Sequence, residues 1–133
     1  MARQLAAHCV YTILHPDRLA EAARLHGPTT FAVGQRWVMG RDLFQQATAQ
    51  GADMPVLFGD ATDCSQLIYW GILQGVELVE RETHYTVAQL RRFTSPHSPQ
   101  DLVLQSNGER IAPGFIRPYA VCVTPQFLEV DLA

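Results

Sequence analysis

Residues 54–80 read M-P-V-L-F-G-D-A-T-D-C-S-Q-L-I-Y-W-G-I-L-Q-G-V-E-L-V-E, and this stretch organises the fold. A short apolar run at 55–58 leads into a small, acidic segment at 59–63, whose composition is typical of a turn. The run from 67 to 80 is long and rich in β-branched and aromatic residues, which predicts one long strand or two bent ones. Gly71 and Gly75 remove side chains where such a strand must bend. The stretch therefore predicts two strands around a polar turn, in a curved sheet.

The segment before this stretch predicts two strands that alternate with two short helices. Residues 9–14 favour a strand, and His15-Pro16 then supplies a cap and a first helical residue for a helix that ends at Gly27. Residues 29–38 indicate a second strand. Asp42 is a candidate cap for a second helix over residues 43–50.

The segment after residue 80 predicts mainly short strands. Residues 85–93 indicate a strand end followed by one helical turn, and residues 94–100 a surface loop. Asn107-Gly108, between residues 102–106 and 109–112, predicts a type I′ hairpin. Residues 119–123 favour a last strand, and residues 125–132 a helical turn or tail. With at least six short strands and the helices mostly early in the chain, this order predicts the α+β class.

Composition indicates a globular chain and one domain over residues 1–133. Of the 133 residues, 47% are hydrophobic and 17% charged, and no apolar run approaches the ~18 residues that span a bilayer. The N-terminal residues make a poor signal peptide, so we expect a cytoplasmic protein without membrane contact. A net charge of −3 argues against broad electrostatic adhesion to duplex nucleic acid.

Common catalytic and cofactor-binding signatures are missing. The sequence contains no G-x-x-x-x-G-K-[ST], G-x-G-x-x-G, H-E-x-x-H or G-x-S-x-G motif. The three cysteines, Cys9, Cys64 and Cys122, have no C-x-x-C spacing, which argues against a zinc ribbon and favours structural thiols. We therefore predict no metal and no cofactor.

The polar turn is the first candidate site. Asp60, Asp63, Cys64 and Ser65 lie between hydrophobic strands and close to Trp70, a combination that suits a small-molecule or base pocket. The same carboxylates could instead bond backbone N–H groups within the turn. Both interpretations stay open at this point.

Arginine and tryptophan form the second candidate site. Arg36 and Trp37 are adjacent, and guanidinium and indole planes can sandwich a base. A tryptophan in an amphipathic strand is also a common core residue. Arg91-Arg92, with Arg110 and Arg117, could form a basic face, although a solvated arginine pair is ordinary.

Two segments, L-F-G-D-A-T-D-C-S-Q-L-I-Y-W-G-I-L-Q-G-V-E-L-V and H-Y-T-V-A-Q-L-R-R-F, together resemble the PUA-like barrels, including the ASCH and EVE types. The chain has no lysine, so the G-x-K-x-x-E-x-R motif of ASCH domains is missing. The resemblance implies a small curved mixed β-barrel flanked by two or three short helices, with a cleft that takes RNA or a nucleobase. It implies ligand contacts from Asp60, Asp63, Cys64 and Ser65, with Trp37 and Trp70 as stacking groups.

Three functions follow from these observations. The leading hypothesis is a binding module that recognises RNA or a modified nucleobase or nucleotide in a cleft beside residues 59–65. The second is a small hydrolase or transferase that uses Asp60, Asp63 or Cys64. The third is a non-catalytic accessory domain that pairs with another protein through exposed apolar surface such as Phe127-Leu128. The oligomeric state stays undetermined at this stage.

Overall fold

The two strands predicted around the polar turn are confirmed, and they lie at the centre of a six-stranded sheet. β3 spans Pro55–Asp60 and β4 spans Asp63–Val79. The computed structural model describes residues 4–112 and 119–132, and for Cys64 and residues 130–132 it describes the backbone only. The sheet order is β2-β5-β4-β3-β1-β6. Its other strands are β1 (His8–Leu14), β2 (Thr29–Val33), β5 (Glu82–His97) and β6 (Tyr119–Val123).

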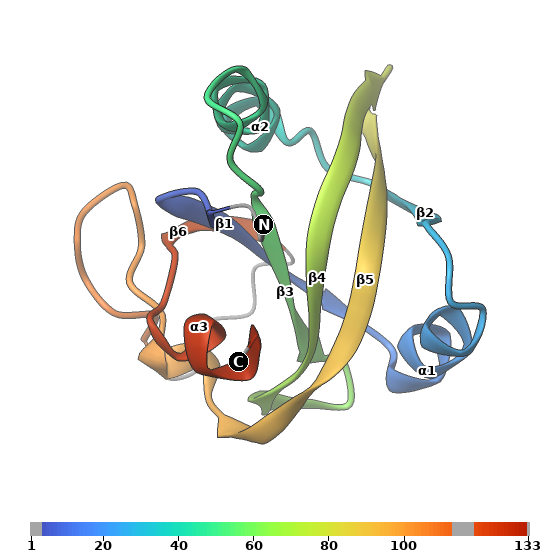
Figure 1. The fold of residues 1–133 in the computed structure, drawn as a ribbon, viewed down its shortest axis with the longest axis vertical. Helices are drawn as coiled ribbons and strands as arrows, with labels where there is room; N and C mark the ends of the chain where they lie inside the picture. The colour runs from blue at the N-terminus through green and yellow to red at the C-terminus, as the bar shows by residue number, and fades with distance from the viewer. Residues whose placement is uncertain (1–3, 113–118, 133) are drawn as a thin grey trace.

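The sheet is mixed and curved, as predicted, but it does not close into a barrel. β1 and β3 pair in parallel, while the other neighbours pair antiparallel. β4 and β5 run side by side along the height of the molecule (Figure 1). The free side of β6 is bonded by residues 103–105, where Gln105 N–H donates to the carbonyl of Val121 and Val123 N–H to that of Val103. β6 is therefore covered by a local segment and does not meet β2, the opposite edge strand.

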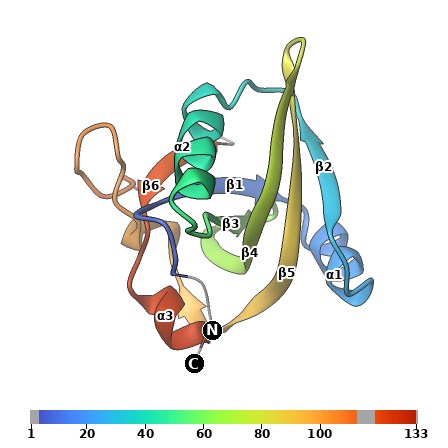
Figure 2. The ribbon, with the colours of Figure 1, turned by 45° about the horizontal axis from the view of Figure 1, so that its top comes forward.

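Helices and loops cover both faces of this sheet, which places the protein in the α+β class. α1 (Pro16–Arg24) lies beside β2 and β5, and α2 (Val38–Ala49) crosses β1 (Figure 2). α3 (Phe127–Leu132) and the short 3-10 helix η1 (Pro99–Asp101) belong to the C-terminal part. No helix in the described part of the chain is long and apolar enough to cross a bilayer.

Two apolar clusters pack on opposite faces of the sheet. Strand alternation separates them, because successive side chains of a strand point to opposite sides. Val56 and Phe58 join the cluster under α1 and α2, while Leu57 joins the cluster under α3. Both clusters contain fully buried aromatic residues, which bury the largest apolar area per side chain.

The first helix follows the sequence prediction closely. His15 is the N-cap, and its imidazole Nδ1 accepts a hydrogen bond from the backbone N–H of Asp17 at 3.2 Å. Pro16 occupies the first turn, where no intrahelical donor is needed. Leu19 and Ala22 are buried, and the helix ends at Arg24, shortly before Gly27.

The second strand and the second helix differ from the prediction. β2 ends at Val33, and α2 begins at Val38 with Trp37 as its N-cap, so Asp42 lies inside the helix. Tertiary contacts explain the change: the Trp37 N–H donates to Thr83 Oγ1 at 2.9 Å, and the indole ring is fully buried. Such packing overrides the strand preference of an aromatic residue.

The helical turn predicted within residues 85–93 is wrong. This segment is the middle of β5, which continues through half of the predicted 94–100 loop to His97. Its partner β4 supplies the hydrogen bonds that a helical turn would otherwise make internally. Pairing with a long neighbour therefore decided the conformation.

The hairpin at Asn107-Gly108 is present as two short contacts and not as a type I′ turn. Val103 and Arg110 form an isolated antiparallel bridge, and Leu104 N–H donates to the carbonyl of Glu109 at 2.8 Å. A type I′ turn needs positive φ at both central residues. Gly108 has a φ of 71°, but Asn107 does not have a positive φ.

Candidate ligand-binding site

The pairing of β4 with β5 shifts register at three places, and two of these are β-bulges that contain a glutamine. Between the pairs Leu73↔Val87 and Gly75↔Thr86, β4 contains Gln74 and β5 contains nothing opposite it. A bulge re-aims the side chain of its extra residue and disrupts the ladder locally. The bulges lie beside Gly71 and Gly75, the positions where the sequence predicted that this strand bends.

The second bulge lies on the opposite strand. Between the pairs Trp70↔Arg91 and Ile72↔Ala88, Gly71 of β4 faces two residues of β5, Gln89 and Leu90. Gln89 has a φ of 55°, in the left-handed region that non-glycine residues seldom adopt. The bulged strand is thus held in a conformation that costs free energy.

Gly71 explains why the second bulge fits. A Cβ atom at this position would lie 2.5 Å from Val87 Cγ1 and 2.9 Å from the carbonyl oxygen of Ala88. The second contact is with backbone, which cannot rotate away. β5 therefore crosses directly over a glycine, a close approach that only a residue without a side chain permits.

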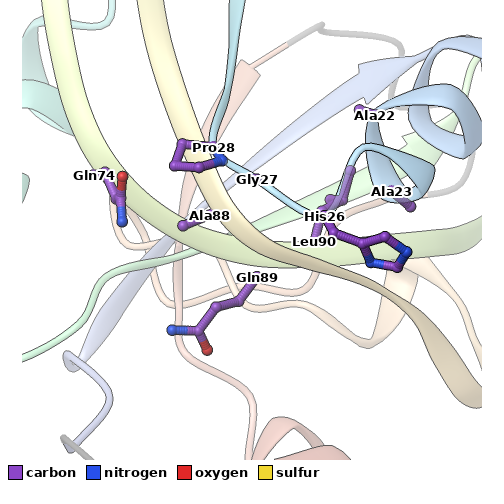
Figure 3. A pocket seen from close by; sticks show the side chains of 9 residues that line it. All are labelled: Ala22, Ala23, His26, Gly27, Pro28, Gln74, Ala88, Gln89 and Leu90. Atoms are coloured by element: carbon purple, nitrogen blue, oxygen red, sulfur yellow. The ribbon is translucent and has the colours of Figure 1, made fainter.

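Two hollows on the surface meet at these bulges. The first, of about 330 Å³, lies between the end of α1 and β5, and the second, of about 480 Å³, lies between α2 and the same strands. In Figure 3 Gln74 and the His26 ring lie on opposite sides of the first hollow. Both hollows are lined by Gln74, Ala88 and Gln89. The first is further lined by Ala22, Ala23, His26, Gly27, Pro28 and Leu90, and the second by Phe44, Thr48, Ala52, Asp53, Ile72 and Leu73.

Backbone strain concentrates at the first hollow. Among the described residues, three non-glycine residues have a positive φ: His26, Glu80 and Gln89. Two of these, His26 (54°) and Gln89 (55°), line the first hollow. Residues held in the left-handed region cluster at ligand-binding sites, where the surrounding structure enforces them.

Arg91 holds Gln89 in place. Its Nε donates to the backbone carbonyl of Gln89 at 3.3 Å, and its Nη2 donates to the side-chain oxygen Oε1 at 3.2 Å. The guanidinium carbon lies 5.0 Å from the centre of the Trp70 ring, in a cation–π arrangement. Trp70 itself is fully buried, so it anchors Arg91 from below.

The acidic turn at residues 59–65 has a different character. Oδ1 of Asp60 accepts from the N–H and the hydroxyl of Thr62, at 2.7 and 2.6 Å. Oδ1 of Asp63 accepts from the N–H and the hydroxyl of Ser65, at 3.1 and 2.6 Å, and these bonds lower the pKa of Asp63. Both predicted carboxylates thus take part in local Asx-type contacts of the kind that stabilise turns.

Arg36 and Trp37 lie at the opposite end of β4 from Asp63. A guanidinium nitrogen of Arg36 donates to the carbonyl of Glu80, just beyond the end of β4 at Val79. The Trp37 ring stacks on Tyr85 at 4.3 Å and on Tyr119 at 5.0 Å between centroids. The structure therefore does not bring the two predicted sites together, and a ligand contact at any of the seven predicted residues stays a prediction.

The remaining titratable candidates are spread over the molecule. Cys9 and Cys122 are buried cross-strand partners, and burial raises the pKa of Cys122 to about 12 and that of Cys9 well above its ordinary value. Thiols of this kind are poor nucleophiles. Within residues 4–112 and 119–132 no three His, Cys, Asp or Glu side chains gather as metal ligands. Arg117 lies outside the described residues.

Sequence reasoning missed the glutamines because a bulge has no local signature. Gln74 was visible as a polar residue inside the apolar run 72–76, which is the one available hint. Gln89 lies between alanine and leucine in a segment that predicted a helical turn. Its positive φ depends on the approach of β5 to Gly71, which sequence alone does not reveal.

No protein-family model and no curated protein sequence matches the chain. Among solved structures, the YTH domain of the Zygosaccharomyces rouxii MRB1 protein, determined in complex with N6-methyladenosine RNA, aligns with a TM-score of 0.48. Sequence identity is 10%, and the alignment covers 98% of this chain and 88% of that one.

Proposed function

We propose that the protein is a binding module for single-stranded RNA, which seats a base in the hollows at the two bulges of β4 and β5. The observation that carries the proposal is the position of Gln74 and Gln89. Gln74 is the extra residue of the bulge on β4, Gln89 is one of the two residues opposite Gly71 in the bulge on β5, and both line both hollows. Bulges of this kind are frequent beside ligand sites.

The lining suits a neutral, flat and polar ligand. Side-chain amides offer N–H donors and carbonyl acceptors, the groups that pair with base edges. His26 and Pro28 supply ring faces in the first hollow, and Phe44 supplies one in the second. The volumes, about 330 and 480 Å³, lie within the range of roughly 300–1,000 Å³ typical of small-molecule pockets.

The charge distribution favours a single strand over a duplex. The net charge is −3, but Arg91 and Arg92 directly follow the bulge on β5, and Arg24 is in the last turn of α1. A few arginines can contact one or two phosphates beside an unstacked base. Recognition of single-stranded RNA depends on stacking and edge hydrogen bonds more than on bulk charge. We include membership of the PUA-like group in this proposal, but the proposed binding of RNA at the hollows does not depend on it.

The test follows side-chain amides by NMR while a short single-stranded RNA or a nucleoside monophosphate is added. We expect the Nε2–H₂ signals of Gln74 and Gln89 to shift first. Gln74→Ala and Gln89→Ala should each weaken binding by about tenfold, the effect of losing one base contact. The matched control is Gln45→Ala, which removes the same side chain from an exposed position on α2 outside both hollows.

The experiment also tests the turn at residues 59–65. If the ligand binds there, Asp63→Ala will weaken binding and Gln89→Ala will not, and the hollow is then the wrong site. No response from either region at millimolar nucleotide and micromolar RNA would contradict the proposed function. Tryptophan fluorescence is a weaker readout, since both Trp37 and Trp70 are fully buried.

A further inference from the structure

The hydrogen bonds between Arg91 and Gln89 determine which polar group Gln89 can offer to a ligand. A guanidinium has five N–H donors and no acceptor. The side-chain atom of Gln89 that Arg91 contacts must therefore be the amide oxygen, and the amide cannot be turned over without placing N–H against N–H. Arg91 also bonds the backbone carbonyl of the same residue, so the contact has two points.

We call this two-point contact between Arg91 and Gln89 the clamp. Both of its residues are restrained by their surroundings. The buried Trp70 ring lies under the guanidinium at 5.0 Å, which restrains Arg91. The backbone of Gln89 is set by the bulge over Gly71, which restrains the start of the side chain. With its oxygen bound to Arg91, the amide presents its NH₂ group, a pair of donors, as the group left for a ligand.

We propose that Gln89 makes this site selective for keto bases, guanine and uracil, over the amino bases adenine and cytosine. The inference rests on the proposed function and adds the class of base. Guanine offers the acceptors O6 and N7, and uracil offers its ring carbonyl oxygens, and both suit an NH₂ donor. At the position where guanine carries O6 and uracil carries O4, adenine and cytosine carry an amino group, whose donors oppose the NH₂ group. A glutamine that is free to turn would instead pair with adenine through both of its amide groups.

The experiment compares the four ribonucleoside 5′-monophosphates as ligands of the full chain, by the NMR shifts of the Gln74 and Gln89 amides. We expect GMP and UMP to bind about five- to tenfold more tightly than AMP and CMP, the discrimination of one good base contact. Gln89→Glu replaces the NH₂ group with an acceptor oxygen and keeps the contact with Arg91. The preference should then reverse toward AMP and CMP.

Arg91→Met is the second variant, because methionine keeps an apolar contact with Trp70 and removes every donor. It should allow the amide to turn and pair with adenine through both of its groups, so that AMP binds at least as tightly as GMP, with binding retained. Equal affinities in the unaltered protein, or a preference for AMP or CMP, would overturn the inference and leave the proposed function standing. Failure of all four nucleotides and of RNA to bind would overturn both.

Discussion

The turn at residues 59–65 and the bulge at residues 88–90 are both places where β4 loses register with a neighbour, yet they use their polar groups in opposite ways. At the turn, β4 separates from β3 with register shifts between Phe58 and Asp60. At the bulge, its pairing with β5 shifts register around Gly71. Both segments carry polar side chains between buried strands, so sequence composition alone does not distinguish them.

The difference lies in where the hydrogen bonds go. At the turn, a carboxylate oxygen of Asp60 and one of Asp63 accept from residues two positions further along the chain. At the bulge, the partner is also two positions along the chain, but it is the side chain of Arg91, which lies over the Trp70 ring of β4, binds the oxygen of the Gln89 amide and leaves its NH₂ group for a ligand. A polar segment is thus a stronger candidate site when the side chain that orients it is packed on another strand than when its groups bond only within their own loop.

The largest expected effect comes from placing a side chain under the bulge. Gly71→Ala should lower the free energy of unfolding by about 1–3 kcal/mol, since the new Cβ would overlap Val87 and the Ala88 carbonyl. Chemical denaturation measures the change. Gly75→Ala is the control, because its Cβ would lie 4.0 Å from Thr86 Oγ1. Equal losses in the two variants would show that Gly71 does not hold the bulge.

A second change separates stability from binding at Gln89. Gln89→Gly should raise the free energy of unfolding by about 0.5–1 kcal/mol, because glycine accepts a φ of 55° without strain. Binding of nucleotide should fall at the same time, since the amide is lost. Denaturation and NMR titration measure the two effects. Gln89→Ala is the comparison, and it should lose binding without gaining stability. An equal rise in the free energy of unfolding in Gln89→Ala would argue against backbone strain at this position.

At the turn, denaturation and NMR titration should show a loss of stability without a loss of nucleotide binding. Asp60→Ala removes the acceptor of two hydrogen bonds from Thr62 and should cost about 0.5–1 kcal/mol of unfolding free energy. Asp60→Asn retains a carbonyl acceptor and should cost less. Nucleotide binding should be unchanged in both. Weaker binding in either variant would move the ligand site to the turn.

The smallest expected effect is a pH dependence at Asp63. Hydrogen bonds from the Ser65 hydroxyl and N–H lower the pKa of Asp63 below its ordinary value of 3.8. The stabilisation is therefore complete well above pH 3.8 and is lost as the pH falls through the lower pKa of the folded protein. Unfolding measured between pH 6 and pH 2 should show a weaker acid dependence in Asp63→Asn. An identical pH profile would mean that these bonds contribute nothing to stability.

Local patterns predicted well where an element depends on its own residues. His15-Pro16 marked the start of α1, and residues 119–123 marked β6, with the bounds that the structure shows. Prediction failed where partners decide the conformation. Trp37 became a helix cap because Thr83 and the rings of Tyr85 and Tyr119 hold it.

The candidate site was predicted less well than the fold. The residues proposed from sequence share a polar or aromatic character, but Trp37 and Trp70 are buried and the aspartates Asp60 and Asp63 bond within their turn. The glutamines at the bulges carry no motif. Their positions are set by the register between β4 and β5, which a single sequence does not contain.

The sequence by itself determined that residues 54–80 form two strands around a turn, within a mixed, curved sheet. It did so because β-branched and aromatic runs, turn residues and helix caps act over a few positions. Only the tertiary structure decided that the sheet stays open and that β4 and β5 bulge against each other. The bulges depend on contacts between different strands, namely the close crossing of β5 over Gly71 and the position of Arg91 over the Trp70 ring. The sheet stays open because residues 103–105 bond the free side of β6.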